Sequence, residues 1–396
     1  MEPSGLCLAA FARSGGLIMI QKIPVVLMRG GTSKCVMLRA EHLPLAGELR
    51  DRLLLRLFGS PDPRQIDGLG GATSTTSKAV IIGPSARDDA DVDYTFAQVS
   101  VDERRVDYRG NCGNCASAIG PFAVREGLVA KSVPLTQVRI YNTNTHKRIV
   151  ADVPVDAEGV QEEGDLAIAG VPGSGARQVL WFEQPTGTNG RGLLPTGRAL
   201  DVVSTAAGPV RATFVDASNP VIFAAAEDLG LLGTEVHPLD GWPAKARRAL
   251  EEVRGFAAAA LGFAADPGAA AAVSRNIPKV GMVLHPADYK DIYGSSIAAD
   301  AQDITARILS MGTLHQAFAL TGAMALAAAT TVPGSVAWMA AGKAQRAALR
   351  IGHPSGVMQV RLRYDDQGQL VALGVERTAR RLIEGTALVP MEATGW

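Results

Sequence analysis

Residues 29–34 read Arg-Gly-Gly-Thr-Ser-Lys, and they separate two segments with strand character. The segment before them, 23–28, reads Ile-Pro-Val-Val-Leu-Met and is rich in the apolar and β-branched residues that strands prefer. Neighbouring glycines let the chain reverse tightly, because glycine adopts backbone conformations that other residues avoid. The stretch therefore predicts a glycine-rich turn between two strands.

The second half of the sequence repeats this order. Ser-Asn-Pro at 218–220 stands between strand-like segments at 210–215 and 221–225. Ser77-Lys78 leads into Ala-Val-Ile-Ile, just as Pro278-Lys279 leads into Val-Gly-Met-Val. A repeat that is weak in identity but constant in order predicts two similar halves. If the halves face each other, their turns would meet at one cleft.

Strand signals outnumber helix signals, which predicts an α+β fold. The spacing of apolar residues predicts helices at 48–58, 114–126 and 243–261. The uncharged stretch 314–342 is broken by Gly, Pro and Thr, so it predicts a buried helix and a loop and not a membrane span. Further strands are expected at 79–82, 92–101, 137–141 and 148–153. The expected divisions are an N-terminal tail at 1–18, a first domain at 19–200, a second at 201–380, and a C-terminal segment at 381–396 that returns to the first domain.

Composition narrows the function classes. The 396 residues include 39 Lys+Arg and 39 Asp+Glu, so the formal net charge is zero, which argues against a nucleic-acid surface. The four cysteines are too few for a disulfide scaffold, and the first residues lack the features of a secretory signal. We therefore expect a cytoplasmic protein that binds neither nucleic acid nor membrane.

The loop at 68–78 reads Gly-Leu-Gly-Gly-Ala-Thr-Ser-Thr-Thr-Ser-Lys. Glycines permit close backbone approach, and successive hydroxyl and N–H groups suit an anion. Lys78 ends this loop and begins an apolar strand, where partial burial would favour a neutral amine that can act as a base. The alternative is a solvated polar loop that ends in an ordinary surface lysine.

The second candidate motif, at 111–115, reads Asn-Cys-Gly-Asn-Cys. Cys112 precedes a predicted helix start, where the helix dipole and free N–H groups favour a thiolate. A buried structural cysteine is the plainer alternative. The Cys-x-x-Cys spacing of Cys112 and Cys115 also leaves a redox role open. The histidines are scattered along the sequence, so the evidence for a metal site is weak.

Weaker candidates lie in the second half: Asn219, Arg275, Lys279, His315 and Ser355. An Asn before Pro is more often a turn residue than a ligand, and a His that opens an apolar helix is more often a capping or core residue. The internal repeat is the only feature that supports each of them as a site residue.

Several of these motifs together resemble the 2-methylaconitate cis–trans isomerase family. They lie at 29–34, 59–62, 66–71, 76–78, 111–114, 194–197, 218–220, 278–279 and 352–356. The relatives of that family include 4-oxalomesaconate tautomerases and methylitaconate isomerases. The resemblance covers about residues 22–390. It implies a fold like that of diaminopimelate epimerase, with two similar domains that each wrap a curved sheet or barrel around a central helix.

The resemblance also implies site residues. The family's catalytic lysine and cysteine correspond to Lys78 and Cys112. The related epimerases use a second thiol, but residues 319–322 contain no cysteine, which fits the isomerase branch. The expected substrate-binding residues are Gly31, Thr32, Ser33, Lys34, Thr73, Ser74, Thr75, Ser77, Asn111, Gly113, Asn114, Asn219, Arg275, Lys279, His315 and Ser355.

The expected reaction is a 1,3-allylic proton shift in an unsaturated tricarboxylic acid such as 2-methylaconitate or aconitate, without cofactor or metal. Tautomerisation of 4-oxalomesaconate is the alternative within the family. A non-catalytic anion-binding protein or a Cys-x-x-Cys redox protein is the alternative from another class. A homodimer would be compatible with any of these.

Overall fold

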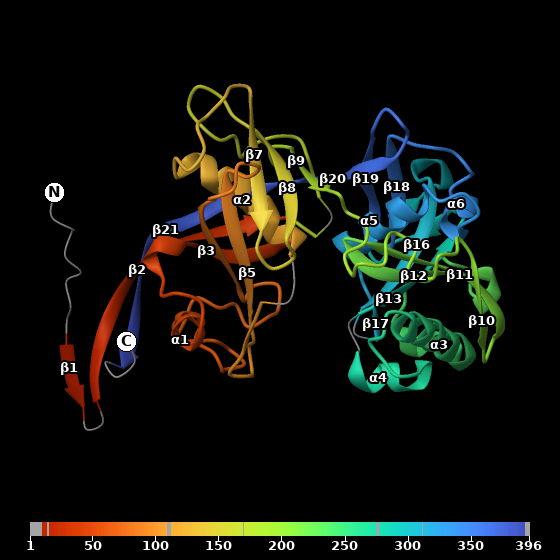
Figure 1. Cartoon of the computed structure of the whole chain (residues 1–396), viewed down its shortest axis with the longest axis horizontal. Helices are drawn as coiled ribbons and strands as arrows, with labels where there is room; N and C mark the ends of the chain where they lie inside the picture. The colour runs from red at the N-terminus through yellow and green to blue at the C-terminus, as the bar shows by residue number, and fades with distance from the viewer. Residues whose placement is uncertain are drawn as a thin grey trace. The chain divides into compact units, whose positions relative to one another are not determined.

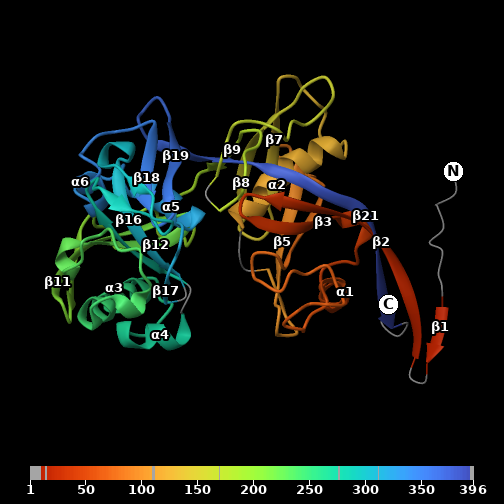
Figure 2. The same ribbon diagram turned by 180° about the vertical axis from the view of Figure 1, so that it is seen from behind.

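The computed structural model describes residues 10–13, 16–108, 112–168, 170–274, 277–310 and 312–392. The chain divides into two compact units, shown in Figures 1 and 2. Unit 1 comprises Met1–Leu180 and Arg377–Trp396, and unit 2 comprises Trp181–Glu376. The strands β9 (Gln178–Glu183) and β20 (Leu370–Arg377) run across the two boundaries.

Unit 1 is built on a mixed sheet. Its strands are β1 (Ala10–Arg13), β2 (Gly16–Gly30), β3 (Ser33–Arg39), β4 (Lys78–Pro84), β5 (Val92–Val99), β6 (Val106–Asp107), β7 (Leu135–Asn142), β8 (Lys147–Pro154) and β21 (Ala379–Glu392), and its helices are α1 (Glu48–Phe58) and α2 (Gly113–Arg125). The terminal strand β21 pairs antiparallel with β2, which pairs with β3 through the predicted turn. The strand pairs β3–β4 and β5–β7 are parallel, and β4–β5 and β7–β8 are antiparallel.

The two faces of this sheet carry different helices. Ala79 and Ile81 on β4 belong to the core that contains the leucines of α1. Because side chains alternate along a strand, Lys78 and Val80 point to the opposite face. The helix α2 packs against β2, β3, β4, β7 and β8 on that face. The sequence pattern of β4 therefore directs Lys78 toward α2.

Unit 2 has the same plan. Its strands are β10 (Asp201–Thr205), β11 (Gly208–Ala217), β12 (Asn219–Ala225), β13 (Lys279–Leu284), β14 (Tyr289–Lys290), β15 (Ser296–Ile297), β16 (Ile304–Ser310), β17 (Thr313–Leu314), β18 (Ala348–His353) and β19 (Gly356–Tyr364), and its helices are α3 (Ala244–Ala260), α4 (Ala270–Val273), α5 (Leu320–Ala329) and α6 (Val336–Ala340). Ala212 and Phe214 on β11 join the core with α3. The helices α3 and α5 lie on opposite sides of β11 and β12 (Figure 1).

The repeat predicted from the sequence is confirmed in the strand pairing. In unit 1, β3 begins at Ser33 and pairs in parallel with β4, which begins at Lys78. In unit 2, β12 begins at Asn219 and pairs in parallel with β13, which begins at Lys279. The two lysines therefore occupy equivalent places.

The predicted helices at 48–58, 114–126 and 243–261 are confirmed as α1, α2 and α3, to within a residue at each end. The stretch 314–342 contains the expected buried helix, α5, but also a second helix, α6, that the sequence did not predict. Ser335 begins α6, because its hydroxyl accepts a hydrogen bond from Trp338 N at 2.9 Å. A residue expected in a loop is thus a helix cap.

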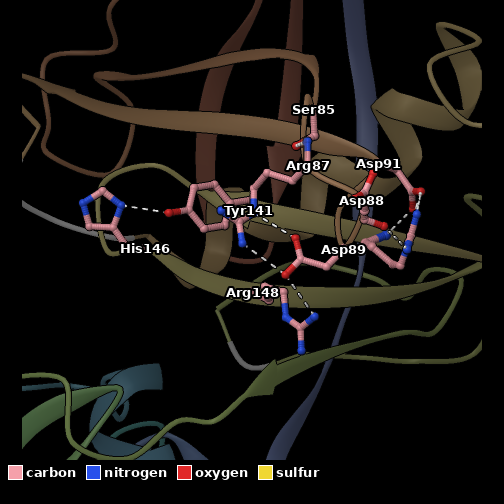
Figure 3. Close-up of polar contacts among 9 residues, drawn as sticks. Ser85, Arg87, Asp88, Asp89, Asp91, Tyr141, His146 and Arg148 are labelled. Carbon is pink, nitrogen blue, oxygen red and sulfur yellow. Dashed lines mark hydrogen bonds and ion pairs between the residues drawn. The ribbon is translucent and has the colours of Figure 1, made fainter.

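A polar network ties the β4–β5 connection to β7 and β8 (Figure 3). The Asp91 carboxylate accepts hydrogen bonds from Arg139 N at 2.7 Å and from Arg139 Nη2 at 2.7 Å. Asp89 bridges Arg87 and Arg148. These contacts hold the β4–β5 connection against β7 and β8.

The predicted α+β class is confirmed. Across the described ranges, none of the helices is both long enough and apolar enough to span a membrane.

Candidate active site

Lys78 is the first residue of β4 and is only 8% exposed. Its Nζ donates a hydrogen bond of 2.6 Å to Gln98 Oε1 on β5 and lies 5.0 Å from the centre of the Phe96 ring. Phe96 and Gln98 reach this position because they point, like Lys78, away from the α1 core. A lysine held in this way has a fixed amine inside the protein and not a freely moving charge in solvent.

Cys112 lies at the start of α2, on the same face of the sheet. It is the N-cap residue, and its sulfur accepts a hydrogen bond of 3.4 Å from Cys115 N. Its thiol lies 4.0 Å from Ser33 Oγ, so the first residue of β3 lies beside the helix start. Cys112 is half-buried, whereas Cys35 and Cys115 are buried, and all three are free thiols.

The Cys112 thiol does not have the ionisation state expected from the sequence. Its contact with the Cys115 side chain and its burial raise the pKa of Cys112 well above the ordinary value. The charge of Lys78 and the N–H of Cys115 lower it, but they do not prevail. The prediction that the helix start favours a thiolate is therefore wrong, because the contact with Cys115 and burial together outweigh the helix terminus. The protonated thiol is a proton donor.

Lys78 and Cys112 lie within electrostatic reach of each other, because the charge of Lys78 acts to lower the pKa of Cys112. The predicted pair therefore consists of a buried amine on a strand and a thiol at a helix start, both on the α2 face. An amine that accepts a proton and a thiol that donates one are the two groups that a proton transfer across a small substrate requires.

The loop at 68–78 is braced from behind by Gln65, which is 1% exposed. Gln65 Oε1 accepts hydrogen bonds from Ala72 N at 2.8 Å and from Ser77 Oγ at 2.7 Å. Ser77 is fully buried, so its hydroxyl supports the loop and is not presented to a ligand.

The exposed part of this loop does present hydroxyl groups. Thr73 Oγ1 lies 3.0 Å from Thr75 Oγ1, and Ser74 borders a 240 Å³ pocket that Gln98 also lines. The carbonyl of Thr75 accepts a hydrogen bond of 3.0 Å from Lys34 N, which joins the loop to the start of β3. Thr73, Ser74, Thr75 and Lys34 thus lie on connected segments beside Lys78.

The turn itself packs closely against the start of α2. A Cβ on Gly30 would lie 2.4 Å from Asn114 O, and one on Gly31, where φ is +50°, would lie 2.3 Å from Asn114 Oδ1. Asn114 Nδ2 donates a hydrogen bond of 2.9 Å to Thr32 Oγ1. Glycine is therefore required here, and it lets Gly31, Thr32 and Ser33 meet Gly113 and Asn114.

Two of the candidates in unit 2, Asn219 and Lys279, begin strands equivalent to β3 and β4. Asn219 Nδ2 lies 3.5 Å from Thr321 Oγ1, the second residue of α5, much as Asn114 on α2 meets the turn in unit 1. Lys279 is 8% exposed, and burial lowers its pKa. Burial and the nearby charge of Lys279 lower the pKa of His315. The hydroxyl of Ser355 donates to Gln316 O, and Gln316 is the residue that follows His315 in the chain.

Two of the predicted residues, Asn111 and Arg275, lie outside the described residues. Gln65 and Gln98 were missed by sequence reasoning, since only the strand register and the loop path bring them to Lys78. Within the described part of the chain, no group of three or more His, Cys, Asp and Glu side chains is placed to hold a metal ion.

Comparison with known proteins identifies the family of the chain. The family described as PrpF protein matches residues 20–390. The chain is 42% identical over 370 residues to a 3-methylitaconate isomerase of Eubacterium barkeri, covering 93% of this chain and 97% of the relative. It is 40% identical over 389 residues to a 2-methyl-aconitate isomerase of Cupriavidus necator, covering 94% and 98%. A 4-oxalomesaconate tautomerase of Pseudomonas putida is 40% identical over 376 residues, covering 94% and 98%.

A solved structure is also similar to this chain over most of its length. The crystal structure of a methylitaconate-delta-isomerase matches with a TM-score of 0.87 and 41% identity, covering 93% of this chain and 96% of that one. The expected fold of two similar units, each with strands and helices, is confirmed. With the family match over most of its length, the chain belongs to the PrpF protein family.

Proposed function

We propose that this protein is an isomerase that moves the double bond of a small unsaturated polycarboxylic acid by a 1,3-allylic proton shift. The observation that carries the proposal is the placement of the buried Lys78 amine and the Cys112 thiol on one face of the unit 1 sheet. The names of the three relatives, two isomerases and a tautomerase of such acids, support the same reaction class.

The proposed chemistry is a pair of proton transfers. Neutral Lys78 removes a proton from the allylic carbon, and the electrons of that C–H bond form a dienolate whose negative charge lies on a carboxylate. Cys112 then gives its S–H proton to the far end of the allylic system, which completes the moved double bond. The proton on Lys78 returns to the Cys112 thiolate, so no electrons are gained or lost and the enzyme is restored. No cofactor takes part in these steps.

The negative charge that develops on the substrate needs nearby hydrogen-bond donors. The start of α2 at Gly113 and Asn114, the hydroxyls of Thr73 to Thr75 and the turn at 31–34 are proposed to supply them. Asn219, Lys279, His315 and Ser355 are proposed to hold substrate carboxylates, and Arg275 completes that set. Of these, Lys279 offers the positive charge best suited to a carboxylate.

The favoured substrates are tricarboxylic acids such as 2-methylaconitate or aconitate, and 4-oxalomesaconate is the second candidate because one relative is named for it. Cys112 must stay a free thiol in this mechanism, so a reducing cytoplasm is the proposed location. The proposed assembly is a homodimer.

The test is proton NMR of the purified protein in deuterated buffer without added cofactor, using 2-methylaconitate, trans-aconitate and 4-oxalomesaconate in turn. We expect deuterium to enter one of these acids at an allylic carbon as its double bond moves. The same run after dialysis against EDTA should give the same rate. Absence of exchange in all three would overturn the choice of substrates, and thiol–disulfide exchange that requires both Cys112 and Cys115 would favour a redox protein.

A further inference from the structure

Gln98 is the residue directly opposite Lys78. The two are Cα partners in the antiparallel pairing of β4 and β5. Ala97 and Val99 belong to the core around α1, so the alternation of side chains turns Gln98 to the same face as Lys78. Such cross-strand partners have Cβ atoms only about 4.5–5.5 Å apart. The geometry of the sheet itself therefore brings these two side chains together.

The orientation of the Gln98 amide is fixed by its other contacts. Its Nε2 donates hydrogen bonds to Ser77 O at 2.9 Å and to Ser74 O at 3.2 Å. Backbone carbonyl oxygens can only accept, so the NH₂ group must face them and Oε1 must face Lys78. One side chain thus anchors the hydroxyl loop at two points and accepts from the Lys78 amine at 2.6 Å.

The charges around Lys78 explain why a neutral acceptor matters here. On α2, the thiols of Cys112 and Cys115 interact with Lys78 electrostatically. On β6, Asp107 is the Cα partner of Gln98. Lys78, Gln98 and Asp107 therefore form one row across three neighbouring strands, with Gln98 between the lysine and the carboxylate.

The pocket on the other side of Gln98 carries further charges, from Asp102 and Arg105. The groups that contact the Lys78 amine itself, the amide of Gln98 and the ring of Phe96, are uncharged. An amide oxygen accepts a stronger hydrogen bond from an ammonium group than from a neutral amine, but it adds no negative charge beside either form. A carboxylate in the same place would stabilise the ammonium group and oppose loss of its proton.

We propose that Gln98 is a positioning residue that aims the Lys78 amine and, by being neutral, leaves it able to act as a base. This inference rests on the proposed function, in which Lys78 removes the substrate proton. The substitution that tests it is Gln98→Glu, which keeps the shape of the side chain and its acceptor oxygen but adds a negative charge.

The expected result concerns the pH profile of kcat/KM. A base is active only when deprotonated, so stabilising the Lys78 ammonium must move the rise in activity to higher pH. We expect Gln98→Glu to shift this rise by about one pH unit or more, which lowers the rate at neutral pH about tenfold and restores it in alkaline buffer. Gln98→Met, which removes the acceptor without adding charge, should lower activity without that shift. Gln367→Glu, the same change at an exposed turn of unit 2, should leave the profile unchanged.

A second readout does not depend on catalysis. Acetylation of Lys78 by acetic anhydride, followed by peptide mass spectrometry across pH, reports when the amine becomes neutral. A shift of both the labelling curve and the rate profile in Gln98→Glu would support the proposal. If the wild type turns over substrate but neither curve shifts in the variant, the proposed role of Gln98 is wrong. The proposed isomerase function would still stand. A shifted labelling curve in a protein that isomerises none of the acids would overturn the proposed function instead.

Discussion

At the residue scale, the two main groups of the candidate site, Lys78 and Cys112, lie in different environments. Lys78 is held by a neutral amide on a strand, whereas Cys112 lies at a helix start with its thiol protonated. The sequence predicts a thiolate for a cysteine in that position, because the N-terminus of a helix favours an anion. The neighbouring Cys115 and the surrounding burial decide the outcome.

The protonated thiol leads to a prediction about alkaline pH. A proton donor works only while it holds its proton, and the pKa of Cys112 is raised above its ordinary value of 9.0. The activity should therefore fall on the alkaline side only above pH 9.0, and Cys112→Ser should abolish most turnover. The check is kcat/KM measured from neutral pH into the alkaline range. A fall in activity close to neutral pH that disappears in Cys112→Ser would show that a low-pKa thiolate is present instead.

Lys279 gives a second prediction at this scale. If its charge holds a substrate carboxylate, Lys279→Met should raise KM about 10- to 100-fold, which corresponds to the loss of one charged hydrogen bond, and should change kcat less. Steady-state kinetics separate the two parameters. Lys290→Met, at an exposed position of the same unit, is the matched control. A large loss of kcat with KM unchanged would place Lys279 in the chemical step.

At the element scale, the turn between β2 and β3 positions the start of α2. A Cβ at Gly30 would come within 2.4 Å of Asn114 O, a backbone atom that cannot move without its helix. Gly30→Ala should therefore push the turn away from α2, lower the free energy of unfolding by about 1–3 kcal/mol and reduce kcat. Urea unfolding and kinetics measure both effects.

Gly385→Ala on β21 is the control for that change, because an added Cβ there meets no atom within 4 Å. Equal stability and activity in the two variants would mean that the contact between the turn and α2 does not hold the site.

The polar network that joins the β4–β5 connection to β7 leads to a prediction about stability at low pH. Burial opposes ionisation of Asp91, but the hydrogen bonds from Arg139 prevail and lower its pKa from the ordinary 3.8. A carboxyl group whose pKa is lowered in the folded protein stabilises the fold at pH values above its ordinary pKa. That stabilisation is lost as the pH falls from the ordinary pKa through the lowered one. Asp91→Asn should thus cost about 1 kcal/mol of unfolding free energy at pH 7 and much less in strong acid. An equal cost at both pH values, measured by urea unfolding, would contradict this assignment.

At the scale of the whole molecule, the sequence was most informative where the pattern is local or repeated. Apolar spacing predicted α1 and α3 closely, and the matching order of turns and lysines predicted that β4 and β13 are equivalent strands. The motifs around Lys78 and Cys112 also identified the family in advance.

What the sequence could not predict depends on contacts between distant segments. Gln98 became part of the site only through its register with Lys78, twenty residues away in the chain, and Gln65 through the path of the loop that it braces. The raised pKa of Cys112 depends on its contact with Cys115 and on burial, and burial is a property that no local motif reports. Strand register and burial are properties of the folded molecule, so residues of these kinds appear only in the structure.

The most direct measurement is the rate at which solvent deuterium enters the substrate at its allylic carbon, followed by NMR in wild type and in Lys78→Met. Lys22→Met, an exposed position on β2, serves as the control. Because the base must remove that proton, Lys78→Met should slow exchange by about 10²- to 10⁴-fold while wild type and Lys22→Met exchange alike. Exchange in folded Lys78→Met at the wild-type rate would show that another group is the base.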